Sequence, residues 1–194
     1  MGLSREQIVY FMAESTYLGG SYARDYRNSR RVGCSNLTNR ILSRPWVGAV
    51  VLSEKGEIIG KGYKQFLDDT NLILHAERVA IEEALINIKR DSLGGATLLT
   101  TLEPCYHEGE KGLNSCSHLI VERGIKKVIF GLEDLSMQKK GVKYLQKCGV
   151  KVEMFEGLNE TITRELMRSP KKTERRLMTN EQWMHFLELL KKQI

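Results

Sequence analysis

The segments His75-Ala76-Glu77 and Glu103-Pro104-Cys105, followed by Cys116, decide the fold and chemistry expected of this chain. One histidine and two cysteines can hold a zinc ion and leave its fourth position open to water, which is typical of catalytic zinc. Glu77 lies two residues after the histidine, so its carboxylate is placed to move protons rather than to bind metal. We therefore predict a Zn²⁺ site made by His75, Cys105 and Cys116, with Glu77 as the catalytic residue.

Other segments surround this motif in a recognisable order: PWVGAVV at residues 45–51, GAT at 95–97, TLEPC at 101–105 and GIKKV at 124–128. With these segments the chain resembles the cytidine-deaminase superfamily of zinc deaminases, and within it the pyrimidine deaminases of riboflavin biosynthesis. The resemblance implies zinc-dependent hydrolytic deamination of an aminopyrimidine or related nucleotide. We expect the deaminase domain alone, without the reductase domain to which many of these enzymes are fused.

The hydrophobic pattern predicts alternating strands and helices. A capping box at Ser4 opens a first helix, which Gly19-Gly20 should end. A hairpin turns at Lys55-Gly56, and residues 64–74 form a loop before the next helix. The remaining elements are strands at 96–102, 126–131 and 150–155, with helices from Cys116 and over 136–148. A helix between consecutive strands implies a parallel crossover. We expect a cytidine-deaminase-like α/β fold: three layers, α/β/α, with a five-stranded mixed sheet whose last two strands are parallel.

We expect residues 1–157 to form the deaminase domain. Within it, residues 19–45 carry six arginines against one acid and form an Arg-rich insertion. Basic residues with interleaved tyrosines can bind single-stranded nucleic acid, although a solvated surface loop has the same composition. Residues 158–194 should form a C-terminal helical extension, with a basic linker at 168–176. The amphipathic last helix should pack on its own domain or on a second subunit, and we expect a homodimer.

Composition sets the cellular context. Lys and Arg outnumber Asp and Glu by 30 to 24, which suits a phosphorylated ligand or nucleic acid. No apolar run approaches the length of a membrane span, and the first residues lack a secretory pattern. With two of the four cysteines assigned to metal, Cys34 and Cys148 are reduced thiols of a cytoplasmic protein.

Three further residues are candidate substrate contacts: Arg44, Ala76 and His107. The resemblance puts an asparagine of the riboflavin family at the position of Arg44, and asparagine reads a base edge with both a donor and an acceptor, whereas arginine only donates. We therefore predict that the riboflavin intermediate is a poor substrate and that Arg44 meets a phosphate or carbonyl group. His107 matches a histidine of the family's cysteine loop. His118 is expected on the solvent side of its helix rather than at the metal.

Two alternatives to a small-molecule deaminase remain open. A deaminase of RNA, tRNA or other nucleic-acid bases would share the zinc chemistry and use the Arg-rich insertion. A catalytically idle relative would keep the zinc for structure or binding, although such a protein has no need of Glu77.

Overall fold

The computed structural model describes residues 3–29, 45–67, 72–107, 114–166 and 180–192. Within these residues five strands form one mixed sheet in the order β2-β1-β5-β6-β7. Strand β1 is antiparallel to both β2 and β5, whereas β5, β6 and β7 are parallel. The predicted α/β class, the mixed sheet and the parallel last pair are confirmed. The strands are β1 (Gly48–Leu52), β2 (Ile58–Tyr63), β5 (Thr97–Leu102), β6 (Lys127–Leu132) and β7 (Lys151–Met154).

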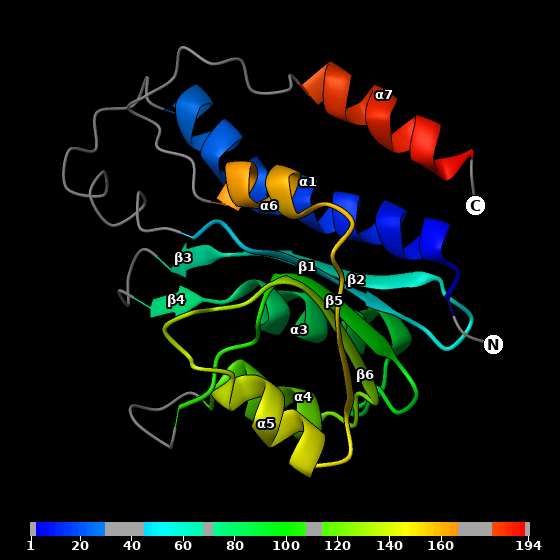
Figure 1. Cartoon of the computed structure of the whole chain (residues 1–194), viewed down its shortest axis with the longest axis vertical. Coiled ribbons are helices and arrows are strands. Elements are labelled where there is room, and N and C mark those ends of the chain that lie inside the picture. The colour runs from blue at the N-terminus through cyan, green and yellow to red at the C-terminus, as the bar shows by residue number, and fades with distance from the viewer. Residues whose placement is uncertain (1–2, 30–44, 68–71, 108–113, 167–179, 193–194) are drawn as a thin grey trace.

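Helices cover both faces of this sheet, which gives the three predicted layers (Figure 1). One face carries α1, α6 and α7, and the other carries α3, α4 and α5. The helices on the first face are α1 (Arg5–Ser29), α6 (Asn159–Leu166) and α7 (Asn180–Lys191). Those on the second face are α3 (Ala76–Ile88), α4 (Cys116–Glu122) and α5 (Lys140–Lys147).

The alternation of side chains along β1 builds a core on each face. Ala49 and Val51 pack with residues of α3, while Val50 and Leu52 pack with residues of α1. All four are at most 1% exposed. Because both faces are covered, the strand is continuously apolar rather than alternating with polar residues.

The first helix is longer than predicted. Its capping box is present, since Ser4 N–H donates to Gln7 Oε1 at 2.9 Å and Gln7 N–H donates to Ser4 Oγ at 3.2 Å. The predicted end at Gly19-Gly20 is wrong, because the helix continues to Ser29. Gly19 instead permits close packing: a Cβ there would lie 2.6 Å from the carbonyl oxygen of Trp46, just before β1.

Two other predicted boundaries also change. Residues 64–74 contain a small hairpin rather than a plain loop, with β3 (Gln65–Leu67) antiparallel to β4 (Leu72–Leu74). Helix α5 begins at Lys140 and not at residue 136. Ser136 is held in a turn by Asp134, whose Oδ1 accepts from the Ser136 N–H at 2.9 Å.

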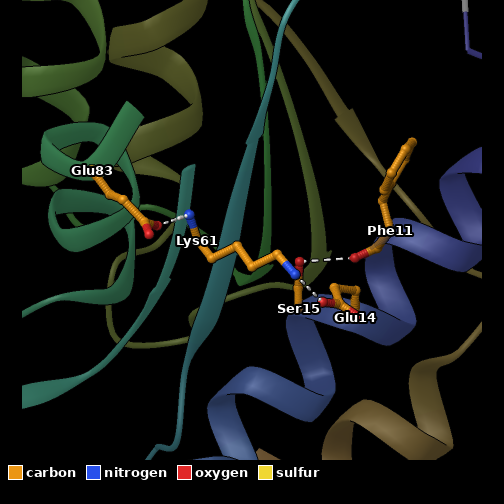
Figure 2. A network of polar contacts seen from close by, with 5 residues as sticks. All are labelled: Phe11, Glu14, Ser15, Lys61 and Glu83. Carbon is orange, nitrogen blue, oxygen red and sulfur yellow. Dashed lines mark hydrogen bonds and ion pairs between the residues drawn. The ribbon is translucent and has the colours of Figure 1, made fainter. Parts of the chain in front are cut away.

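The outer strand β2 is tied to a helix on each side of the sheet (Figure 2). On one side the Glu83 carboxylate of α3 accepts from the Lys61 N–H, and Asn87 donates to the Ile59 carbonyl at 2.9 Å. On the other side Lys61 Nζ pairs with Glu14 Oε1 of α1 at 2.7 Å. Side chains of α3 therefore form hydrogen bonds with main-chain groups on the outer edge of β2.

The C-terminal helices pack on the first helix. Ile162 of α6 joins the core beneath α1, and Leu187 of α7 packs against Ala13. The amphipathic last helix thus packs on its own chain, one of the two arrangements expected. No helix among the described residues is both long enough and apolar enough to cross a membrane.

Candidate active site

Three separate elements bring the predicted metal ligands together. His75 is the N-cap residue of α3, Cys105 follows the end of β5, and Cys116 is the first residue of α4. The ligand atoms of these side chains all lie within 4.8 Å of one another. His75 Nδ1 is 3.3 Å from Cys105 Sγ and 3.4 Å from Cys116 Sγ.

These distances fit a tetrahedral zinc ion. With Zn–S near 2.3 Å and Zn–N near 2.0–2.1 Å, sulfur and nitrogen ligands of such a site lie about 3.6 Å apart. Two sulfur donors and an imidazole also match the ligand preference of zinc. Among the described residues three protein atoms converge rather than four, so the set resembles catalytic sites, which leave a position for water.

The two cysteines already differ in acidity. A hydrogen bond from Cys116 lowers the pKa of Cys105 to about 4, so Cys105 holds a thiolate at neutral pH. The same bond and burial raise the pKa of Cys116. The Cys116 main-chain N–H also donates to Cys105 Sγ at 3.4 Å. Helix α4 therefore starts directly against the thiolate.

Glu77 lies in the first turn of α3, beside the histidine and the cysteines. Its side chain is buried, with only 3% of its surface exposed. Burial raises its pKa to about 7, while the charge of His75 opposes this shift. A carboxyl group with such a pKa can both take up and release a proton near neutrality.

A pocket of about 100 Å³ opens beside these residues, at the end of the sheet where β5 and β6 finish. Open α/β sheets bind ligands at the carboxyl ends of their parallel strands. The pocket is lined by Pro45, Val47, Lys64, His75, Ala76, Glu77, Leu102, Glu103, Cys105 and Asp134.

The three predicted substrate contacts differ in their position relative to the pocket. Ala76 is buried and lines the pocket. His107 is exposed and does not belong to the pocket lining. Arg44 lies outside the described residues, as does most of the 19–45 segment.

Sequence reasoning missed Lys64 and Asp134. Lys64 directly follows β2, whose last residue, Tyr63, pairs with Gly48 at the start of β1. Strand β1 is antiparallel to β5, so this end of β2 lies at the same edge of the sheet as Glu103. Burial lowers the pKa of Lys64. The hairpin register was the available signal, because it places the residue after β2 at the ligand-binding edge.

Comparison with known proteins finds a riboflavin-biosynthesis protein and a pyrimidine deaminase among the relatives of this chain. The chain is 40% identical over 116 residues to "Riboflavin biosynthesis protein RibD" of Actinobacillus pleuropneumoniae, which covers 59% of this chain and 27% of that protein. It is 37% identical over 108 residues to "Diaminohydroxyphosphoribosylamino-pyrimidine deaminase" of Schizosaccharomyces pombe, covering 55% of this chain and 25% of that one. The chain thus spans about a quarter of the length of these curated relatives.

Two solved structures of deaminases have a similar fold. A diaminohydroxyphosphoribosylaminopyrimidine deaminase/5-amino-6-(5-phosphoribosylamino)uracil reductase of Thermotoga maritima superposes with a TM-score of 0.61 at 30% identity, covering 84% of this chain and 40% of that one. The dCMP deaminase of cyanophage S-TIM5 superposes with a TM-score of 0.54 at 22% identity, covering 79% of this chain and all of that one. This second likeness shows the fold alone.

The match to a protein family covers the predicted metal ligands, Glu77 and every pocket-lining residue except Asp134. The family described as "Cytidine and deoxycytidylate deaminase zinc-binding region" matches residues 34–132, half of the chain, and these residues include His75, Glu77, Cys105 and Cys116. With this match, the fold of its solved relatives and three zinc-type ligands around a buried glutamate, the chain belongs to the cytidine and deoxycytidylate deaminase family.

Proposed function

We propose that this chain is a zinc-dependent hydrolytic deaminase of an aminopyrimidine nucleotide or related base, similar to the deaminases of riboflavin biosynthesis. The observation that carries the proposal is the buried carboxyl group of Glu77 beside the His75, Cys105 and Cys116 ligand set. A site that used zinc for structure alone would be closed by a fourth protein ligand. It would also gain nothing from a buried acid with a pKa of about 7.

In this proposal His75, Cys105 and Cys116 hold the zinc ion. Zinc bound there supplies Lewis-acid activation of water at neutral pH. Glu77 accepts a proton from the attacking water and delivers protons to the ring nitrogen and to the departing ammonia. The substrate loses its amino group as ammonia and gains an oxo group, so one water molecule is consumed in each turnover.

Lys64 supports a substrate that carries an oxo group or a phosphate. Its ammonium group is a donor of hydrogen bonds in a pocket that also contains the acidic side chains of Glu103 and Asp134. Such a pocket can pair with a base that has acceptors on one edge and donors on another. Ala76 forms part of the wall, and we retain Arg44 and His107 as substrate contacts from outside the lining residues.

We assign residues 1–157 to the deaminase domain and residues 158–194 to a helical extension. The packing of Leu187 against Ala13 supports a role of this extension in covering α1. The homodimer and the nucleic-acid contact of residues 19–45 stay predictions.

The test combines metal analysis with a deamination screen. Purified protein should contain one zinc ion per chain and release ammonia from one of a panel of aminopyrimidines, their nucleotides and RNA. Glu77→Gln should lower kcat/KM by roughly 10²–10⁴-fold, the usual contribution of general acid–base catalysis, and retain zinc. The matched control is Glu82→Gln, the same change at an exposed position of the same helix, which should keep wild-type activity.

Three outcomes would overturn the proposal in different ways. Native protein without zinc would remove the mechanism. Stoichiometric zinc without turnover of any compound would indicate the idle relative. Turnover of RNA alone, weakening steeply with salt, would indicate a nucleic-acid deaminase, because each phosphate contact releases counterions.

A further inference from the structure

Three aromatic rings that take no part in the proposed catalysis contact one another beside the two cysteines. The rings of Tyr106 and His118 are stacked, with centroids 5.2 Å apart and an interplanar angle of 21°. The ring of Tyr144 lies 4.9 Å from Tyr106 and 4.6 Å from His118. These separations are within the range that aromatic pairs prefer. His118, predicted to face solvent, is therefore half-buried in this aromatic cluster.

The members of the aromatic cluster sit next to the metal ligands in the chain. Tyr106 directly follows Cys105, and His118 lies two residues after Cys116. Tyr144 comes from α5, which packs beside α4. The cluster thus joins both ends of the ten-residue connection between the two cysteines, and it anchors both ends to a third element.

Hydrogen bonds extend this arrangement to the helix that carries Cys116. The buried Ser115 caps α4, because its Oγ accepts from the His118 N–H at 3.4 Å. The same Oγ lies 2.7 Å from His118 Nδ1, so the imidazole is fixed to the residue that precedes the cysteine. The two ends of the connection are also bonded directly, because the Ser117 N–H of α4 donates to the Cys105 carbonyl oxygen at 3.1 Å.

Bringing two thiolates together is unfavourable before the metal arrives. Closing the connection costs chain entropy, and zinc takes both cysteines as thiolates, whose negative charges repel one another. Groups outside the ligand set that fix ligand orientation typically change metal affinity 10–100-fold. The aromatic cluster is placed to do this, since it holds the residues adjoining both sulfur ligands.

We propose that Tyr106, His118 and Tyr144 are positioning residues that hold Cys105 and Cys116 at the separation zinc requires. The proposal rests on the zinc site of the proposed function. It concerns the affinity for the metal and not the deamination step, so it can fail while the proposed function stands.

The test measures zinc affinity by competition with a chromophoric chelator, together with the melting temperature of the zinc-free protein. Tyr144→Leu removes two of the three ring contacts and should weaken zinc binding roughly tenfold. Tyr144→Phe keeps the ring and should restore the wild-type affinity. Tyr10→Leu is the matched control: it removes a ring contact with Phe11, 5.3 Å between centroids, on the opposite face of the sheet. This control should lower the melting temperature and leave zinc affinity unchanged.

Each result decides between the alternatives. Wild-type zinc affinity in Tyr144→Leu would overturn the inference. Equal loss of zinc affinity in Tyr144→Leu and Tyr10→Leu would also overturn it, because the aromatic cluster would then contribute only to the stability of the fold. Wild-type protein that binds no zinc would overturn the proposed function as well. If Tyr144→Leu does not fold, His118→Gln serves instead, because it removes a ring and keeps a polar group towards Ser115; it should show the same tenfold loss.

Discussion

Two glycines of β2 allow α3 to lie directly on the sheet, and only one of them faces the turn that carries Glu77. A Cβ on Gly62 would clash with the Ala76 carbonyl oxygen and lie 2.5 Å from the Ala80 nitrogen. A Cβ on Gly60 would clash with the Ala80 carbonyl oxygen and lie 2.7 Å from the Ala84 nitrogen. Alanine at either position therefore overpacks the contact with the same helix, and the two contacts lie one helical turn apart.

The size of the effect follows from these contacts. Since Cβ atoms essentially never approach another heavy atom within 3.0 Å, Gly62→Ala must move β2 and the start of α3 apart by at least 0.5 Å. A displacement of 1 Å in an active site can cost about 10²-fold in rate, so we expect kcat/KM to fall by about tenfold or more. Overpacking should also lower the free energy of unfolding by about 1–3 kcal/mol. For a chain of this length each kcal/mol lowers Tm by about 2–4 °C.

The assay compares the two alanine variants side by side. Thermal unfolding should show a similar loss of stability in Gly62→Ala and Gly60→Ala. Zinc affinity and kcat/KM, measured on the substrate found by the screen, should fall mainly in Gly62→Ala, because His75 and Glu77 belong to the turn above that glycine. Equal losses of activity in both variants, or full activity in Gly62→Ala, would refute the reasoning.

Three further predictions concern other parts of the chain. Ser4→Ala removes the capping box of α1 and should lower Tm by about 2–4 °C, corresponding to about 1 kcal/mol, with activity unchanged in the deamination assay. Leu187→Ala removes the buried contact of α7 with α1 and should cost about 2–5 kcal/mol in chemical denaturation; an unchanged midpoint would show that α7 does not pack on α1 in solution. Lys64→Met should reduce kcat/KM by roughly 10–150-fold, mainly through KM, because a hydrogen bond to a charged group is worth about 1.5–3 kcal/mol. Unchanged KM would exclude a substrate contact by this lysine.

The order of elements and the convergence of His75, Cys105 and Cys116 could be predicted because their signals are local. Strand β5 is a continuous apolar run that stops at Glu103-Pro104, and α3 begins with the residues that follow His75. The parallel pairing of β6 and β7 followed from the helix between them.

The misplaced helix end and the missed pocket residues have non-local causes. Glycine at the end of a helix typically adopts a left-handed conformation, whereas Gly19 lies inside α1. Its lack of a side chain leaves room for the main chain at the start of β1. Lys64 has no motif of its own and becomes a pocket residue through the register of three strands. The aromatic cluster joins Tyr106 to Tyr144, two residues 38 positions apart, through the packing of two helices.

The hydrogen bonds on the outer edge of β2 affect whether a strand of another protein can pair with this sheet. A bare sheet edge offers rows of unpaired donors and acceptors that template the addition of a foreign strand. Here Glu83 occupies the Lys61 donor and Asn87 occupies the Ile59 acceptor, so an incoming strand would first have to displace both side chains. Helix α3, whose first turn carries Glu77, thus also protects this edge of the sheet against the addition of a further strand.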